Sequence, residues 1–527
     1  MAEAKRVLTF HSDAVEDETL QVLELAGTEE ISRYFVFNLE LVSTKVDVKF
    51  EDMLKKAARL EIKQGVKLAG GDKRGIQTLK IHGVLRSFEQ VEQRHEWVRY
   101  RAELVPTLWR LSLTYRSRIF LEKTVVEIAK EVLKEYGLAD QDDFEFRCSE
   151  PPKREFVMQY EESDLDFLDR WLEREGIFYF WEHSDSGSKL VFADSTAAYQ
   201  PIQGTPTIQY KPLGDADNRV EAGESDKASE DWFREEIIPV FTFSRRVVPK
   251  KVVLSDYNWR KPTEPLVAEQ NASDNGDGFV YEYNNHYKNK DEGKKVAQIR
   301  SEEILAREIF YSGESDCRSF RAGATYTLDK HYRSDLNNSH LLVEVRHEAS
   351  QSVELGSKTI NAKYRNSFRS IPADRTYRPP QRTAWPKISG FLSAVIDASG
   401  DGKYAEIDDM GRYKVKFPLD LSDKKDGKAS RYLRMMQPYA GGGMGMHFPL
   451  HKGTEVAVMF LDGDPDRPII AGAIPNPDTS SPVAGGNQTQ CKIQTGGGNV
   501  LQFEDNDGSQ QITIHSPKEG TTLTFGA

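Results

Sequence analysis

The sequence predicts a mainly β protein with an α/β insertion and a small barrel of the OB type near its C-terminal end. Three observations support this fold class. Short runs of alternating apolar and polar residues recur along the chain, which is typical of strands with one buried face. Residues 112–200 contain two segments with apolar residues at helical spacing. Residues 411–472 combine short strands with tight glycine and proline turns, as small closed barrels do.

The composition is that of a soluble chain with several domains. Its 527 residues correspond to about three or four domains. Hydrophobic residues make up 38%, which is enough for real cores, and the mean hydropathy is −0.60. Lys and Arg number 71 against 83 Asp and Glu, and the resulting net charge of −12 argues against a general polyanion binder.

Targeting signals and cysteines both indicate folding in a reducing cytoplasm. The N-terminal residues 1–18 lack the apolar core of a signal peptide, and no apolar run approaches the roughly 18 residues of a membrane span. Any export would therefore use a route without a cleaved Sec signal. Cys148, Cys317 and Cys491 lie far apart without a CxxC or Cys/His cluster, so we expect free thiols.

Residues 1–108 form the first predicted domain, which consists of strands. The alternating runs and one short helix lie at 20–25, 34–42, 81–85, 97–105 and, for the helix, 50–58.

Residues 109–200 form the second predicted domain, which mixes helices and strands. Thr124 with a glutamate three residues later is a capping-box pattern, and Gly137 is placed to end that helix. Ser163 with an aspartate three residues later repeats the start signal, and Gly176 follows the second helix.

Residues 201–375 form the third predicted domain, a second mixed segment. Strand-like runs at 241–254, 278–287, 326–328 and 341–347 flank a helix expected at 294–310. The run 214–236 holds nine acidic residues against three basic ones, and we expect it to be a solvated surface.

Residues 376–475 form the fourth predicted domain, a linker followed by the OB-type barrel. A group of prolines marks the boundary: Pro372, Pro379, Pro380 and Pro386. The expected barrel strands are 411–418, 455–460 and 469–472. Four glycines within 441–445 predict a mobile loop, because neither a helix nor a strand interior favours such a run.

Residues 476–527 form the last predicted segment, a series of short strand pairs. Their apolar residues are Val500, Phe503, Ile512, Ile514, Leu523 and Phe525. One copy cannot bury these side chains, because an isolated hairpin is marginally stable in water, but neighbouring chains could. The uncapped strand end at 523–527 predicts either a covering tip protein or a shortened chain.

Several runs resemble VgrG, the trimeric spike family of type VI secretion systems, which is related to the hub and spike of contractile phage tails. These runs are DDMGRYKVKFP (408–418), GGGMGMHFPLHKGTEVAVMFLDGDPDRPIIAGAI (441–474), YEESDLDFLDRWLEREGIFYFWEH (160–183), EEISRYFVFNLELVS (29–43), FRAGATYTLDKH (320–331) and SHLLVEVRHEA (339–349). The resemblance implies two barrel-like tube-initiator domains, an inserted α/β domain, an OB-fold barrel and the start of an intertwined trimeric β-helix.

The resemblance also implies a function and a set of partners. The chain would be a homotrimeric, non-enzymatic spike that docks on the hexameric tube of haemolysin-coregulated protein. It would contact baseplate components and carry a PAAR-type tip protein and effectors into the target cell, after assembly in the cytoplasm. An enzyme, either glycan-cleaving or toxin-bearing, is the alternative, and so is the spike of a phage tail or injection particle.

Two patterns suggest metal ligands, and both favour a structural interpretation. His447 and His451 are four residues apart, but the surrounding glycines and Pro449 argue against the helix that would bring the rings together. Asp462, Asp464 and Asp466 start like a calcium loop, but this run lacks the required glycine at the sixth position and glutamate at the twelfth. We therefore expect a rigid turn at residues 462–466, and likewise a β-turn at 505–508. For the chain as a whole we expect no metal, cofactor or catalytic residue.

Other function classes lack their sequence signatures. No GxSxG elbow, HExxH helix or GxxxxGK[ST] loop occurs in the chain. About twenty residues separate Ile474 from Ile493, too few for an enzyme domain between barrel and β-helix. OB folds often bind nucleic acid, but residues 385–475 hold twelve basic and twelve acidic residues, so we expect no nucleic-acid partner.

Overall fold

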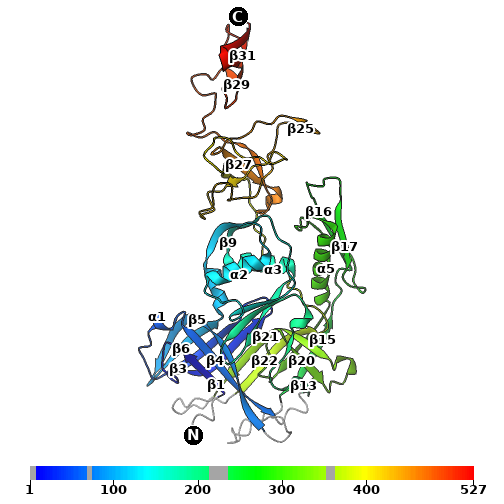
Figure 1. Ribbon diagram of the computed structural model, residues 1–527. Helices are drawn as coiled ribbons and strands as arrows, with labels where there is room; N and C mark the ends of the chain where they lie inside the picture. The colour runs from blue at the N-terminus through cyan, green and yellow to red at the C-terminus, as the bar shows by residue number, and fades with distance from the viewer. Residues whose placement is uncertain (1–6, 68–73, 213–235, 352–362, 527) are drawn as a thin grey trace. The chain divides into compact units, whose positions relative to one another are not determined.

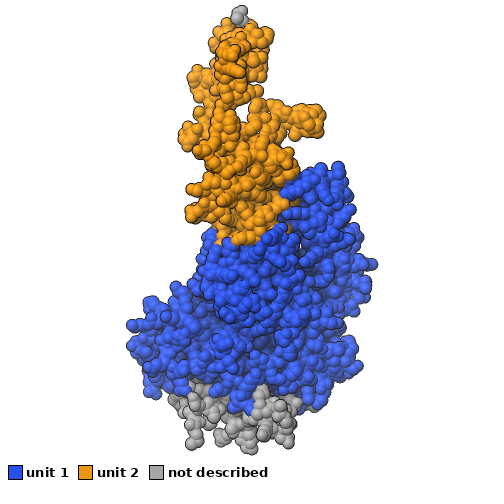
Figure 2. Space-filling model, in the orientation of Figure 1, with its two compact units in different colours: residues 1–116, 124–153, 162–385 blue, residues 117–123, 154–161, 386–527 orange. Residues whose placement is uncertain are grey.

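The computed structural model describes residues 7–67, 74–212, 236–351 and 363–526. The chain forms two compact units (Figure 2). Unit 1 contains residues 1–116, 124–153 and 162–385, and unit 2 contains residues 117–123, 154–161 and 386–527. The division into five domains stays a prediction. Most of the acidic run 214–236 lies outside the described residues.

A 14-stranded sheet dominates unit 1 (Figure 1). Its main path runs β1-β4-β5-β6-β3-β2-β21-β20-β13-β14 and is open at both ends among the described strands. The strands of its first half are β1 (Leu8–Ser12), β2 (Gln21–Glu30), β3 (Val36–Ser43), β4 (Ala57–Lys67), β5 (Arg74–Arg94) and β6 (Trp97–Val105). Those of its second half are β12 (Gln200–Pro201), β13 (Thr207–Tyr210), β14 (Ile237–Ile238), β15 (Val240–Arg245), β19 (Ile309–Ser315), β20 (Ala324–Asp329), β21 (Ser339–Ser350) and β22 (Lys363–Pro372).

Strands β2 and β21 join the two halves by antiparallel pairing, from Glu24 opposite Ser350 to Glu30 opposite Glu344. The first half encloses its own core, in which Phe35 and Phe37 meet edge to face with ring centroids 5.7 Å apart. The barrel-like halves predicted from sequence are therefore continuous through one sheet.

The α/β insertion begins with the helix that the capping box predicted. Helix α2 (Val125–Glu135) starts at Thr124, whose hydroxyl accepts the N–H of Glu127 at 3.0 Å while the Glu127 carboxylate accepts the N–H of Thr124 at 2.7 Å. Helix α3 (Asp164–Glu175) starts at Ser163 and ends at Gly176, which has a φ of 70°. Both predicted helices are confirmed. The accompanying strands are β7 (Tyr115–Phe120), β8 (Phe144–Arg147), β9 (Val157–Ser163), β10 (Phe178–His183) and β11 (Ser188–Ala193).

A second α/β element packs helix α5 (Lys290–Ala306) against the sheet β17-β16-β18. The predicted helix 294–310 was placed too late, because Asn289 caps α5 by accepting the N–H of Glu292 and β19 begins soon after the helix ends. The predicted strand 241–254 is wrong as one element. Pro249 separates β15 from β16, which pair in different sheets. The bounds of this sheet are β16 (Lys251–Asp256), β17 (Leu266–Asn271) and β18 (Phe279–Tyr283).

The smaller helices are short. The helix predicted at 50–58 is only α1 (Phe50–Met53), because β4 begins at Ala57. The 3-10 turns are η2 (Thr107–Leu113), η3 (Thr196–Ala198), η6 (Ser334–Leu336), η7 (Leu461–Gly463) and η8 (Lys518–Gly520). Among the described residues, none of the helices combines the length and apolar composition that crossing a lipid bilayer requires.

Unit 2 contains an OB-type sheet in the order β24-β23-β27-β28. These strands are β23 (Phe391–Ile396), β24 (Val415–Lys416), β27 (Glu455–Phe460) and β28 (Pro468–Ala473), and β27 matches the predicted strand. The core of this sheet also contains Ile119 from β7 and Phe156 and Met158 from the segment around β9. Two early chain segments thus complete the core of a unit that is otherwise C-terminal.

The glycine run of unit 2 forms a short hairpin, and its mobility stays a prediction. Strands β25 (Ala440–Gly441) and β26 (Met444–Gly445) pair with each other.

After β27 and β28, the chain forms a four-stranded antiparallel sheet, which we call the meander. Its strands are β29 (Gln490–Gln494), β30 (Val500–Glu504), β31 (Gln511–Ser516) and β32 (Thr521–Phe525).

Candidate assembly surfaces

The meander presents one apolar face to solvent. Side chains point alternately to the two faces of a strand, and the pairing register brings the apolar positions of all four strands into line. Phe503 lies opposite Cys491 and Ile512, and Ile514 lies opposite Leu501 and Leu523. The exposed fractions along this face are 41% at Ile493, 40% at Phe503, 38% at Ile512, 47% at Ile514, 51% at Leu523 and 52% at Phe525.

Tight turns set this register. Gly498, Gly508 and Gly520 have φ values of 83°, 76° and 66°, a region that glycine adopts without strain. The N–H of Ser509 donates to the Asn506 carbonyl at 2.9 Å, so the turn predicted at 505–508 lies one residue later. Short strands and sharp turns thus place five of the six apolar residues predicted for this segment on one face, together with Ile493. Val500 lies opposite His515 and points to the other face. No described part of unit 2 covers the apolar face completely.

A second exposed apolar surface lies on the OB-type sheet. Phe391 on β23 lies opposite Met459 on β27, and both side chains point away from the core, with exposed fractions of 60% and 44%. The neighbouring residues Val456 and Val458 point inward and are fully buried. We call this surface the outer sheet face. It also includes Ser393, Val395, Ala457 and Leu461.

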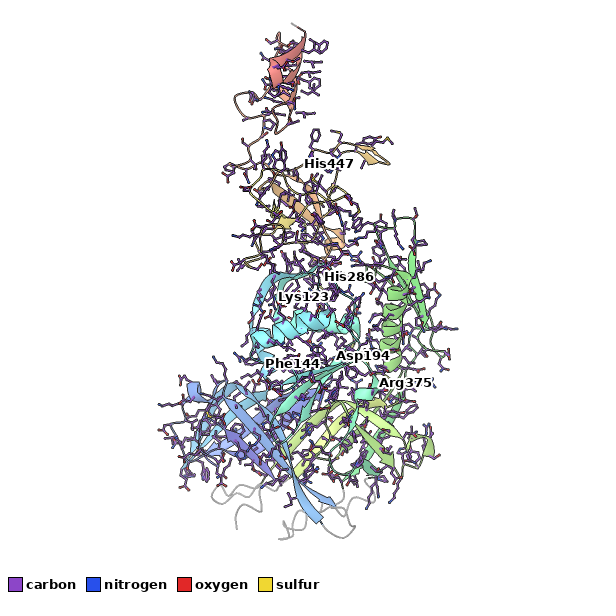
Figure 3. All side chains as sticks on the ribbon, viewed as in Figure 1. Lys123, Phe144, Asp194, His286, Arg375 and His447 are labelled. Carbon is purple, nitrogen blue, oxygen red and sulfur yellow. The ribbon has the colours of Figure 1, made fainter. Side chains whose placement is uncertain are left out.

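His447 and His451, which are four residues apart in the sequence, have different partners in the structure. His447 lies near the base of the β25–β26 hairpin (Figure 3), where its Nε2 is 3.0 Å from the Tyr413 hydroxyl and its Nδ1 is 3.3 Å from Gln437 Nε2. His451 instead packs edge-on against Tyr404, with ring centroids 5.3 Å apart. His447 therefore has a structural place at the hairpin base, which sequence spacing did not reveal.

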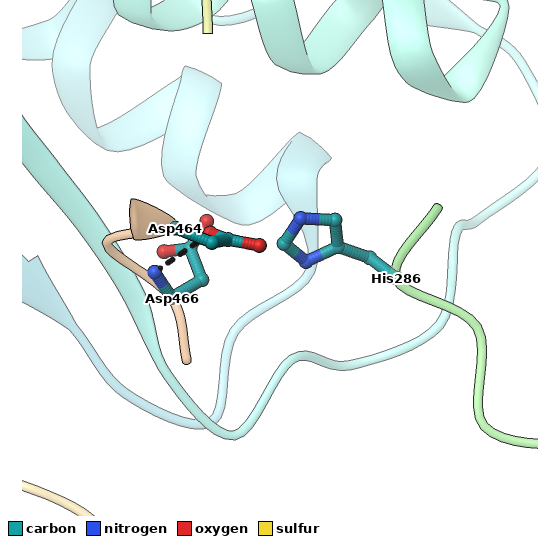
Figure 4. A group of neighbouring side chains, drawn as sticks. All are labelled: His286, Asp464 and Asp466. Carbon is teal, nitrogen blue, oxygen red and sulfur yellow. Dashed lines mark hydrogen bonds between the residues drawn. The ribbon is translucent and has the colours of Figure 1, made fainter. Parts of the chain in front are cut away.

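The run of three aspartates forms a turn between β27 and β28. Asp464 and Asp466 are 4% and 6% exposed, and the N–H of Asp466 donates to Asp464 Oδ1 at 3.0 Å (Figure 4). Asp466 Oδ1 in turn accepts the N–H of Met158 at 2.6 Å. Asp462 lies in the left-handed region with φ of 55°. The turn interpretation is consistent with this geometry, which ties the β9 segment to the OB-type core.

Comparison with known proteins identifies the family. The profile of the phage tail baseplate hub (GPD) family matches residues 28–353, and that of the type VI secretion system/phage-baseplate injector OB domain matches residues 403–474. The type VI secretion system spike proteins VgrG1b and VgrG1c of Pseudomonas aeruginosa are each 30% identical over 95% of this chain. The chain belongs to the VgrG spike family.

This VgrG-family chain spans 66% of VgrG1b, 67% of VgrG1c and 49% of VgrG3 from Vibrio cholerae, to which it is 29% identical. Solved structures share its fold. A type VI secretion component from E. coli, the c3393 protein, superposes with a TM-score of 0.61 at 22% identity and covers 88% of this chain and 99% of its own. A chain of the Francisella PdpA–VgrG complex gives a TM-score of 0.63 at 10% identity, over 98% of this chain and 78% of its own.

Two groups of buried charged residues in this VgrG-family chain were not predicted from the sequence. In the first, Glu29 of β2 lies 3.1 Å from His347 Nε2 and 3.5 Å from Arg321 Nε. Burial opposes its ionisation, but Arg321 and His347 hold the pKa of Glu29 below its usual range. Burial lowers the pKa of nearby His183 to about 4. Residues that are far apart in the sequence thus form charged contacts across the β2–β21 pairing.

In the second group, Asp169 of α3 accepts the Tyr179 hydroxyl at 3.1 Å and lies 3.4 Å from Arg33 Nη1. Burial raises the pKa of Asp169 to about 8, despite Arg33, and burial also raises the pKa of Glu173 one turn later. Glu173 accepts two backbone N–H groups, from Arg382 and Thr383, at 3.0 Å each. These carboxyls hold the insertion and the linker together.

A cavity of about 730 Å³ in unit 1 is lined mainly by polar side chains, including Lys80, His183, Gln203 and Arg321. Three acidic residues also line it. Glu182 pairs with Arg147 at 2.9 Å, whereas Asp142 and Asp143 are exposed. A glycosidase needs one buried carboxyl beside a second carboxylate, and none of these three acidic side chains is fully buried.

Proposed function

We propose that this chain works as the homotrimeric spike and hub of a type VI secretion system. The exposed apolar face of the meander carries the proposal, together with membership of the VgrG family. Six apolar side chains stay 38–52% exposed in a single copy. Three copies around one axis would bury them against each other, and threefold symmetry closes such a contact into a finite ring.

The mechanical role follows from this arrangement. Each chain contributes two sheet halves joined by β2 and β21, so a trimer would present six halves to a hexameric tube of haemolysin-coregulated protein. Stacked strand ladders resist axial compression, because sliding breaks many backbone hydrogen bonds together. Baseplate components, a PAAR-type tip protein and effectors are the remaining proposed partners, and the assembled spike would leave the cytoplasm by injection.

We also propose that the chain is not an enzyme and uses no cofactor. Its relatives are spike proteins by name, and none of the acids lining the unit 1 cavity is fully buried. Incubation with peptidoglycan, nucleic acid and ATP tests this proposal. Turnover that is lost on Glu182→Gln would place an enzyme in that cavity and contradict it.

The decisive experiment is the mass of the full chain in solution, by light scattering behind a sizing column. Three chains of 59.9 kDa would give about 180 kDa. A monodisperse monomer at the concentrations tested would contradict the trimeric spike. Binding to purified tube protein, measured on the same column, would then test the docking step separately.

A further inference from the structure

The β25–β26 hairpin, which we call the flap (residues 438–449), contacts the described core of its own unit at its base, through His447, and is otherwise exposed. All of its residues are exposed, and its two strands contain only two residues each. Its large apolar side chains have exposed fractions of 55% at Tyr439, 61% at Met444, 42% at Met446 and 49% at Phe448. A hairpin this short is unstable by itself in water, so its conformation implies a surface that covers it in the assembly.

The base of the flap is firmly attached to the OB-type core. Tyr413 is fully buried, and its hydroxyl contacts His447 Nε2 at 3.0 Å and accepts the N–H of Leu450 at 3.2 Å. The N–H of Met446 donates to the Tyr439 carbonyl at 3.0 Å and closes the hairpin. The flap is therefore held at its base and presents its apolar side chains at a defined place on unit 2.

The outer sheet face combines large exposed side chains with small residues. Its Phe391 and Met459 stand above small neighbours, Ser393 and Ala457, which lie opposite each other across β23 and β27. A Cβ added at Gly472, which lies opposite Ala457 on β28, would meet nothing within 4 Å.

We propose that the flap of one copy packs on the outer sheet face of the next copy in the trimer, and this inference rests on the proposed homotrimeric spike. Both surfaces belong to the same unit and both stay exposed, so they do not cover each other within one chain. A threefold ring requires two different surfaces that fit each other, one on each side of the copy. The flap carries exposed flexible methionines and the outer sheet face is apolar and exposed, so unit 2 offers two different surfaces for such a contact.

Crosslinking between differently tagged copies tests the contact. Both copies carry Cys491→Ser, because Cys491 is an exposed thiol. One copy adds Met444→Cys on the flap and the other Met459→Cys on the outer sheet face, and the co-expressed trimer is treated with a short bismaleimide. We expect a covalent dimer that contains both tags. In the matched control, Leu421→Cys replaces Met459→Cys, since Leu421 is 92% exposed and lies on neither surface, and we expect no dimer.

The outcomes separate the contact from the trimer. A trimeric mass with no more crosslinking than the control would overturn the flap contact alone, whereas a monomeric mass would overturn the trimer and the contact together. Methionine oxidation of the unmodified chain gives a second measurement. Met444 and Met459 should react several-fold more slowly in the assembled protein than in the urea-unfolded chain, and equal rates in the two states would overturn the contact.

Discussion

Replacing Phe503 by alanine should weaken the trimer by an amount that follows from its exposure. Phe503 lies on β30, in the middle of the apolar face, and 40% of its surface is exposed in one copy. A phenylalanine presents about 200 Å², so about 80 Å² per chain would be buried on assembly. At about 25 cal/mol per Å², the loss is about 2 kcal/mol per chain and about 6 kcal/mol per trimer.

This loss corresponds to a fall of about 10⁴ in the association constant. The concentration at which half of the chains are trimeric varies inversely with the square root of that constant, so it should rise about 100-fold. Sedimentation equilibrium over a dilution series, with low urea if the parent trimer is too tight, measures this midpoint.

The matched control is Tyr332→Ala in unit 1. Tyr332 is 80% exposed, so its replacement removes more exposed aromatic surface than that of Phe503, but outside the meander. We expect the control to leave the midpoint unchanged. Hydrogen exchange should show that the meander of Phe503→Ala is still folded. If it is folded and the midpoint is unshifted, this face is not buried between copies.

Three further predictions concern unit 1. Thr124→Ala removes the α2 cap and should cost about 1 kcal/mol, seen as faster hydrogen exchange in the first turn of the helix; unchanged exchange would contradict the capping role. Gly27→Ala brings a Cβ within 2.3 Å of the buried Phe37 ring and should destabilise unit 1 by about 1–3 kcal/mol in urea unfolding, and a neutral result would mean that the ring can shift. In the folded chain the pKa of Asp169 is about 8, whereas the ordinary value is 3.8. Between these pH values the folded state binds a proton that the unfolded state has lost, so the free energy of unfolding falls as pH rises. Asp169→Asn should flatten that decline in urea midpoints between pH 5 and pH 8, and an identical slope would contradict the assignment.

The sequence predicted the elements whose signals are local. The start of α2 depends on Thr124 and Glu127, three residues apart, and β27 depends on alternation within six residues. Such signals survive folding because the groups that make them are neighbours in the chain. The end of α5 was misplaced, since helical spacing continued into residues that pair better as β19.

Long-range features could not be predicted in the same way. The β2–β21 seam pairs residues more than 300 positions apart, and the Glu29–His347 contact depends on that pairing. The inclusion of Ile119 and Met158 in the core of unit 2 likewise depends on tertiary packing. Of the candidate surfaces, the meander was expected from its short strand pairs, whose apolar residues one copy cannot bury. The hairpin of the flap was not predicted, because glycine content indicates backbone freedom and does not reveal the pairing of two short strands.

The distribution of exposed apolar side chains separates the two units. Among the described residues, unit 2 has nineteen large exposed apolar side chains and unit 1 has twelve, although unit 1 is the larger. Fourteen of those in unit 2 lie on the meander, the outer sheet face and the flap. The unit that would form the trimer axis therefore has the less complete apolar burial. For such a unit, folding stability and association are linked by mass action. Assembly would then complete the hydrophobic core of unit 2, while unit 1, with its closed cores and buried ion pairs, would keep its fold in each copy.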